Sequence, residues 1–275
     1  MNKYEDFLGL GIAGNFALHL DQAGEAVEFK DIITADEAAP KGMFPFYFPV
    51  PCSAKKILHT YPLSHDTLKL PASDVNVQAE PEVGLICELN YKDGVLSSIT
   101  PTHFGAYNDC SIRIAGAAKI SDKKNWGASS KGVSDTLIKI DKFSHNGIMD
   151  NYSICSFLKR DDELKAYGED ARLTGYSYFY EKLLSWMLHQ LNTQKDFGPL
   201  EELSKYIKES DNPKKAIISI GATRYTSYGE KTFLKKDDEI IIAIYNRNDF
   251  SINDVTTNIK NNSFDKMSVL AQKVI

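Results

Sequence analysis

The first fifty residues alternate between apolar runs and turn-forming residues. Leu8–Ala13 is predicted to be a β-strand, and a helix is expected from Asn15 to about Ala23 with Asn15 as its N-cap. Aromatic and proline residues then crowd together between Phe44 and Pro51. Because prolines remove backbone donors and hold the chain extended, this stretch is predicted to be an extended, buried segment.

Short apolar runs divided by turns dominate the rest of the chain, which predicts β-sheet. Apolar residues recur at spacings of three and four over Tyr176–Leu191 and predict a helix there, and a second helix is expected from Pro199 to Lys208. The predicted strands are Val75–Ala79, Glu82–Tyr91, Val95–Ile99, Ala216–Ile220 and Glu239–Tyr245, with a turn at Lys92-Asp93-Gly94. The last strand is almost wholly apolar and is therefore expected to be buried on both faces.

Two stretches are polar. Residues 115–135 are rich in serine, lysine and glycine and predict a mobile surface loop, and the chain after Asn246 is predicted to be a surface-lying appendage. We therefore predict a β-rich α+β protein. It has a small N-terminal lobe at residues 1–70 and a larger domain at residues 71–275, with the polar appendage after about residue 246.

Composition narrows the class of protein. The 275 residues are 43% hydrophobic and 25% charged, as in ordinary globular proteins, and the net charge of −5 argues against a nucleic-acid or anionic-membrane partner. No apolar run approaches the roughly 20 residues that cross a bilayer. The four cysteines form no C-x-x-C pair, and the acidic N-terminus is unlike a signal peptide. These features predict reduced thiols and a cytoplasmic protein.

Glu80-Pro81-Glu82 carries the first chemical signal. Residues i and i+2 of a strand face the same side, so two carboxylates converge there and suit a hard divalent metal ion. The alternative is a solvated, acidic strand face. Asp109 favours the metal site, because it lies in a strand-like segment that carries no other charge as far as Arg113.

These residues occur in an order that resembles the fumarylacetoacetate hydrolase family. Glu80-x-Glu82 is followed by an apolar strand, a turn and the segment Asn108-Asp109-x-Ser111-x-Arg113, which is similar to the N-D-x-S-x-R segment of that family. The match continues outward in several places, which include Gly14-Asn15-Phe16-x-x-His19, Phe46-Tyr47-Phe48-x-x-Pro51-x-Ser53, Lys131 followed by Asp135-Thr136, and Gly221-Ala222-Thr223 before Phe233–Asp238 and the final strand. The resemblance implies a mixed β-sheet roll and a homodimer.

The resemblance also implies a site. Glu80, Glu82 and Asp109 are expected to bind Mg²⁺, or Mn²⁺ or Ca²⁺, with His19 as general base and Lys131 as a second positive group. Asn108, Arg113 and Thr223 are expected to contact the substrate. Such a site suits a small oxo acid or 1,3-dicarbonyl compound, and a metal-stabilised enolate would support C–C bond hydrolysis, decarboxylation or keto–enol isomerisation.

One departure from the family pattern leaves a rival interpretation. The family pairs its histidine with a glutamate three residues later, whereas this chain has Gln22, which cannot act as a base; Asp21 or Glu25 are the possible substitutes. The alternative is therefore a degenerate relative that binds a metal or a small acid without turnover. Without a functional role, His19 would be a helix residue packed on the core and Lys131 a solvated charge in a polar loop. The enzymatic hypothesis requires that the three carboxylates meet with no basic side chain between them.

Overall fold

A computed structural model describes residues 2–17, 19–24, 26–34 and 36–275. The strands are β1 (Leu8–Ala13), β2 (Gly42–Tyr47), β3 (Leu63–Ser64), β4 (Thr67–Leu68), β5 (Asn76–Gln78), β6 (Pro81–Lys92), β7 (Val95–Asn108), β8 (Ser111–Arg113), β9 (Lys131–Val133), β10 (Ile138–Lys139), β11 (Tyr152–Arg160), β12 (Glu163–Arg172), β13 (Lys215–Ser219), β14 (Glu239–Asn246) and β15 (Ser268–Val274). The α-helices are α1 (His19–Gln22), α2 (Tyr180–Thr193), α3 (Leu203–Glu209) and α4 (Ile252–Lys260). Short 3₁₀ helices include η1 (Ala26–Phe29), η3 (Ile120–Lys123), η5 (Leu173–Gly175) and η6 (Gly229–Lys231).

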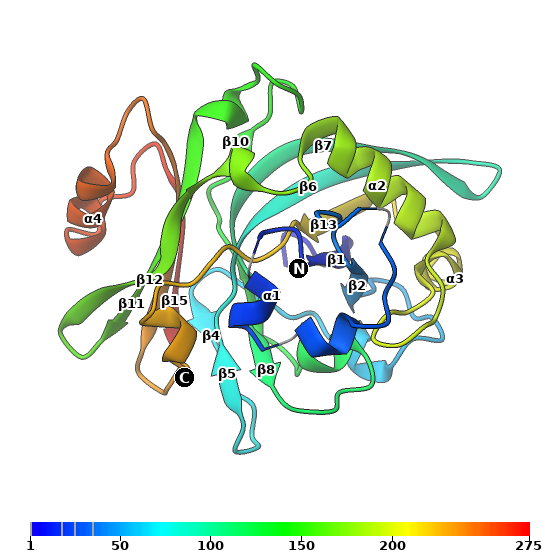
Figure 1. The fold of residues 1–275 in the computed structure, drawn as a ribbon, viewed down its shortest axis with the longest axis horizontal. Coiled ribbons are helices and arrows are strands. Elements are labelled where there is room, and N and C mark those ends of the chain that lie inside the picture. The colour runs from blue at the N-terminus through cyan, green and yellow to red at the C-terminus, as the bar shows by residue number, and fades with distance from the viewer. Residues whose placement is uncertain (1, 18, 25, 35) are drawn as a thin grey trace.

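The main sheet of the described residues has the strand order β2-β1-β13-β6-β7-β9-β3, with β10 paired to β7. Two of its pairs, β1–β13 and β3–β9, are parallel, and the others are antiparallel. The sheet curls strongly, with the long β6–β7 hairpin arching around β1, β2 and β13 (Figure 1). The protein thus has the predicted β-rich fold with few helices. The lobe boundary near residue 70 stays a prediction, although strands from both sides of it share this sheet.

A second sheet has the order β12-β11-β14-β15-β4 and lies beside the first (Figure 1). As predicted, the central residues of β14 are buried on both faces. On one face, α4 packs Val255 and Ile259 against apolar side chains of β11 and β14. The chain after Asn246 is therefore no surface-lying appendage, because β15 is hydrogen-bonded between β14 and β4.

Two further local predictions were wrong. The expected helix from Asn15 shortens to α1, and Leu18, which that helix would include, lies outside the described residues. Asn15 does not cap it: its Nδ2 donates to the carbonyl oxygens of Tyr178 and Ile220 at 3.0 and 2.8 Å. The expected surface loop at residues 115–135 contains η3 and β9, and its lysines at positions 123, 124 and 131 are buried.

Small residues in β1 allow two aromatic rings to lie flat on the strand. A Cβ added at Gly9 would lie 2.6 Å from Phe46 Cδ2, and one added at Gly11 would lie 2.6 Å from Phe44 Cε2. Each ring also lies near a cation: Lys131 Nζ is 5.3 Å from the Phe46 ring centre, and Lys124 Nζ is 5.2 Å from the Phe44 ring centre. The rings thus form an apolar floor beneath two buried ammonium groups.

No helix among the described residues is long and apolar enough to cross a membrane.

The carboxyl group of Glu201 is buried, and it makes the stability of the fold depend on pH. Burial raises the pKa of Glu201 to about 7, although the Ser121 hydroxyl donates a hydrogen bond to it. The folded protein therefore keeps a proton that the unfolded chain loses above about pH 4.5, so this group destabilises the fold increasingly as pH rises to 7.

Glu201→Gln is expected to remove that penalty. Between pH 5 and pH 8, the variant should gain stability relative to the wild type by on the order of 3 kcal/mol, measured by urea unfolding at each pH. A difference between variant and wild type that does not change with pH would contradict the assignment.

Candidate functional site

Three acidic residues from the ends of two paired strands meet in the interior. Glu80 directly precedes β6, Glu82 is the second residue of β6, and Asp109 directly follows β7. The register pairs Pro81 with Asn108, and the Asp109 amide donates to the Glu80 carbonyl oxygen at 3.0 Å. Carboxylate oxygens of this acidic triad (Glu80, Glu82, Asp109) all lie within 4.8 Å of one another, and all three side chains are buried. The predicted convergence is therefore present.

Three basic side chains contact the acidic triad. Arg113 Nη1 lies 2.9 Å from Glu80 Oε1, and Lys131 Nζ forms an ion pair with Asp109 Oδ1. Lys124 Nζ lies between two members of the triad, 2.6 Å from Glu80 Oε2 and 2.6 Å from Asp109 Oδ2. The oxygens converge as predicted, but the expectation that no basic side chain lies between them was wrong, because Lys124 bridges Glu80 and Asp109. A metal ion could use these oxygens only in place of that ammonium group.

The surroundings shift the pKa values of Glu80 and Glu82 in opposite directions. Burial acts to raise the pKa of Glu80, but the positive charges of Lys124 and Arg113 outweigh it and hold that pKa well below its usual range. For Glu82, burial raises the pKa well above its usual range, and the Asp109 carboxylate raises it further. Glu80 is therefore ionised at neutral pH, whereas Glu82 keeps a proton unless a further cation joins it.

Glu82 is held by the backbone rather than by a base. Its Oε2 accepts a hydrogen bond from the Gly221 amide at 2.8 Å. Gly221 has φ +111°, and an added Cβ would lie 2.9 Å from Asn15 Cβ. A glycine is therefore needed here, because only glycine adopts this backbone conformation at such close approach.

Helix α1 places His19 next to the acidic triad, and the Thr223 carbonyl oxygen holds its ring. His19 is buried, its Nδ1 lies 3.0 Å from the Thr223 carbonyl oxygen, and its charge acts on the Glu80 carboxyl group. With Nδ1 donating to that carbonyl, the lone pair of the neutral ring lies on Nε2. Gln22, one turn later, makes two hydrogen bonds to the Tyr225 backbone, at 2.9 and 3.1 Å.

The remaining predicted residues have structural partners. Asn108 Oδ1 accepts from the Glu80 amide at 3.1 Å, and its Nδ2 donates to Gln272 Oε1 at 2.9 Å. Thr223 Oγ1 donates to the Pro81 carbonyl oxygen at 3.2 Å. Their contact with a substrate stays a prediction. Of the substitutes for the missing glutamate, Asp21 is exposed, and Glu25 lies outside the described residues.

Sequence reasoning missed Lys124. It follows Lys123 in a polar stretch, and its spacing from the acidic residues has no distinguishing period. The one available signal was charge: three buried carboxylates need compensation, and Arg113 and Lys131 supply only two positive charges. A third cation or a proton on one of the carboxyl groups would complete the balance, and the sequence alone could not tell a lysine, a metal ion and a proton apart.

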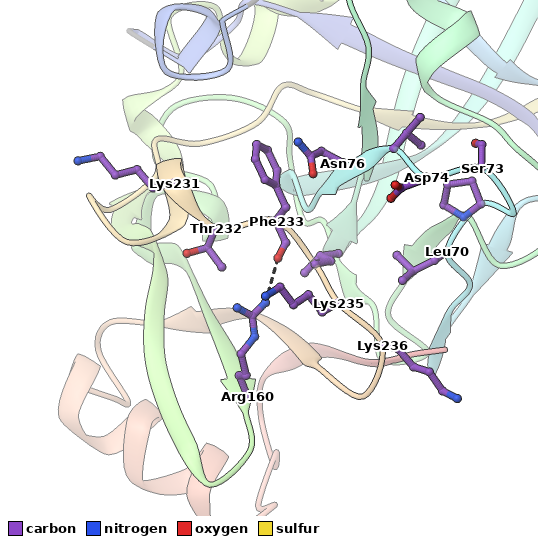
Figure 2. A pocket seen from close by; sticks show the side chains of 13 residues that line it. Leu70, Ser73, Asp74, Asn76, Arg160, Lys231, Thr232, Phe233, Lys235 and Lys236 are labelled. Atoms are coloured by element: carbon purple, nitrogen blue, oxygen red, sulfur yellow. Dashed lines mark hydrogen bonds between the residues drawn. The ribbon is translucent and has the colours of Figure 1, made fainter.

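Two surface cavities lie outside the acidic triad, and neither is lined by any of its members. One, of about 640 Å³, is lined by Phe16, Leu20 and Asp21 of the segment around α1. Residues 19 and 21 face nearly opposite sides of a helix, so α1 separates this cavity from buried His19. Another, of about 600 Å³, lies around Arg160, Lys235 and Asn76 (Figure 2). It includes no member of the acidic triad and none of the bases that contact it.

The family model of a "Family of unknown function (DUF5718)" matches residues 25–274. The chain belongs to this family. No curated protein matches the DUF5718 chain. Its fold is nevertheless shared by solved structures.

A 2-keto-3-deoxy-D-arabinonate dehydratase complexed with magnesium and 2,5-dioxopentanoate matches at TM-score 0.55 and 13% identity, over 97% of this chain and 72% of that one. A 5-carboxymethyl-2-hydroxymuconate delta-isomerase from Mycobacterium smegmatis matches at 0.54 and 10%, over 98% and 78%. A putative fumarylacetoacetate hydrolase family protein from Yersinia pestis CO92 matches at 0.54 and 12%, over 98% and 93%. At these identities the likeness establishes the fold that the sequence motifs predicted.

The acidic triad has the donor set of a hard divalent ion. Three carboxylates within 4.8 Å of one another supply the oxygen ligands that Mg²⁺ and Mn²⁺ prefer. Burial first, and the Asp109 carboxylate second, raise the pKa of Glu82, and a bound cation would oppose both effects by favouring the ionised carboxylate. The DUF5718 protein could therefore hold a metal ion here, in competition with the ammonium group of Lys124.

Proposed function

We propose that this DUF5718 protein is a metal-dependent enzyme that acts on a small oxo acid or a 1,3-dicarbonyl compound, with Mg²⁺ or a similar ion on Glu80, Glu82 and Asp109. The observation that carries the proposal is the convergence of three buried carboxylates beside His19. The shared fold of a dehydratase and an isomerase supports it. C–C bond hydrolysis, decarboxylation and keto–enol isomerisation are the candidate reactions.

A divalent ion on the acidic triad would polarise a substrate carbonyl group and stabilise negative charge on its oxygen. The protein's own groups would do the rest. Lys131 and Arg113 place fixed positive charge beside Asp109 and Glu80, in a buried setting where charges act strongly. His19 Nε2 would accept a proton from the substrate or from water, while the Thr223 carbonyl oxygen holds the opposite ring nitrogen.

A substrate in the cavity along α1 would have to pass that helix to reach His19, which lies on its other side. Because Gln22 is held by the Tyr225 backbone and cannot ionise, His19 would work without a carboxylate from that position. A homodimer and a cytoplasmic location remain expectations, the first testable by light scattering of the purified chain.

The test combines metal binding with turnover. Mn²⁺ is expected to raise the melting temperature of the wild type, and Glu82→Gln to abolish the rise. Oxaloacetate or an acylpyruvate should be consumed in the presence of Mn²⁺, and His19→Ala should lower kcat by about 10²–10⁴-fold while leaving the melting shift in place. His189→Ala is the matched control, because that histidine is exposed on α2. Absence of any metal effect on the wild type would refute the proposal.

A second candidate is favoured by Lys124 and Gln22: a protein that binds a small acid without turning it over. Lys124 already forms ion pairs with two of the carboxylates, and Gln22 stands in place of the glutamate that usually accompanies the histidine. This candidate predicts that oxalate binds, by calorimetry, while no acid in a broad panel is consumed. Any turnover that depends on His19 would exclude it.

A further inference from the structure

The position of Lys124 is built into the fold. The residue directly follows η3, and its side chain is 4% exposed. Its neighbour Asn125 is fixed, because Asn125 Nδ2 donates to the carbonyl oxygens of Phe46 and Thr60 at 2.8 and 3.0 Å. The ammonium group lies over the Phe44 ring, which Gly11 allows to lie flat against β1. Elements from three parts of the chain thus direct this lysine to the acidic triad.

Lys124 engages the same carboxylates that a metal ion would need. Its Nζ is 2.6 Å from Glu80 Oε2 and 2.6 Å from Asp109 Oδ2, and 3.4 Å from the Asp109 carbonyl oxygen. A divalent ion bound to those two oxygens would lie within a few ångströms of the ammonium group, in a buried setting where like charges repel strongly. The ion and the ammonium group therefore compete for the same two carboxylates.

We propose that Lys124 is the resident cation of the acidic triad and that a divalent ion binds there only by displacing it. The proposal rests on the proposed function in taking Glu80, Glu82 and Asp109 as the metal ligands, and it adds the residue that sets their affinity. Arg113 pairs with Glu80 and Lys131 with Asp109, whereas Lys124 lies between these two carboxylates.

The chain offers a matched control in the preceding residue. Lys123 is as deeply buried as Lys124, but its Nζ pairs with Glu28 Oε2 of η1 at 2.8 Å rather than with the acidic triad. Lys123→Met and Lys124→Met therefore remove the same group from the same segment. They differ in whether the lost ammonium touches the candidate metal ligands.

The experiment measures Mn²⁺ affinity on the full chain, by electron paramagnetic resonance of free Mn²⁺ and by calorimetry. Lys124→Met is expected to lower the Kd for Mn²⁺ at least tenfold relative to wild type, and Lys123→Met to change it by less than twofold. Lys124→Arg, which keeps the charge, should bind no tighter than wild type. Lys124→Gln provides a second neutral variant if the methionine variant fails to fold.

The outcomes separate this inference from the proposed function. If Lys124→Met binds Mn²⁺ and the wild type does not, the inference holds and a metal-dependent reaction of the wild type is refuted. If the two bind equally, the proposed function stands and the inference fails. If the folded neutral variants bind no Mn²⁺ at all, the inference is overturned as well.

Discussion

Replacing Asp109 with asparagine is expected to lower the free energy of unfolding by about 3–5 kcal/mol. The change keeps the shape of the side chain but removes the one carboxylate that pairs with both Lys131 and Lys124. Lys131 is completely buried, and burial already lowers its pKa while Asp109 opposes that effect. Without Asp109, Lys131 must lose its proton or remain as an uncompensated buried charge. Urea unfolding followed by the fluorescence of Trp126 and Trp186 measures the loss.

A double variant provides the control. Lys131→Met together with Asp109→Asn removes one cation with one anion, and Lys124 keeps Glu80 as its partner. The double variant should therefore recover much of the stability that Asp109→Asn loses, which gives a coupling energy between the two positions. A loss below about 1 kcal/mol in the single variant would mean that these ion pairs do not stabilise the fold.

The acidic triad could be predicted because it depends on short-range patterns. The Lys92-Asp93-Gly94 turn and the apolar runs on either side predict the β6–β7 hairpin, and the hairpin brings its two distant ends together. Even so, counting back from the turn would set Pro81 opposite Ala106. Two irregularities shift the register, between Ile86 and Cys87 and between Asn90 and Tyr91, and they bring Asn108 opposite Pro81. The family motifs, rather than the counting, identified Asp109 as the partner.

The errors concern polar residues that are buried because of distant partners. The chain after Asn246 looks like a surface segment, yet two of its polar side chains are buried in β15. Ser268 Oγ accepts a hydrogen bond from the Ala106 amide at 3.0 Å, and Gln272 accepts one from Asn108. The stretch around Lys124 was misjudged in the same way. Polar composition alone predicts a surface position for such residues. They are buried because their hydrogen-bond partners lie on elements more than a hundred residues away or, for Lys124, because carboxylates at the ends of the hairpin pair with the ammonium group.

The support for Arg113 extends to a glycine far from the acidic triad. The Gly229 carbonyl oxygen accepts from Gln78 Nε2 at 3.0 Å, and Gln78 Oε1 accepts from Arg113 Nε at 2.8 Å. Arg113 in turn contacts Glu80. A Cβ at Gly229 would lie 2.9 Å from the Tyr167 carbonyl carbon and closer still to its oxygen. The Tyr167 carbonyl oxygen also accepts a hydrogen bond from the Thr226 amide at 3.0 Å, which ties the chain leading into η6 to β12 at the point where the added Cβ would enter.

Gly229→Ala is therefore expected to destabilise the fold by about 3 kcal/mol, as overpacking against backbone does. Gly175→Ala is the matched control, since Gly175 also lies in a 3₁₀ helix and its added Cβ would come no closer than 3.5 Å to Phe16. That control should change the stability by less than about 0.5 kcal/mol, as at other surface positions. Urea unfolding of both variants checks this. Equal losses would show that η6 can shift away from β12, and that the hydrogen-bond chain through Gln78 does not depend on a glycine at this position.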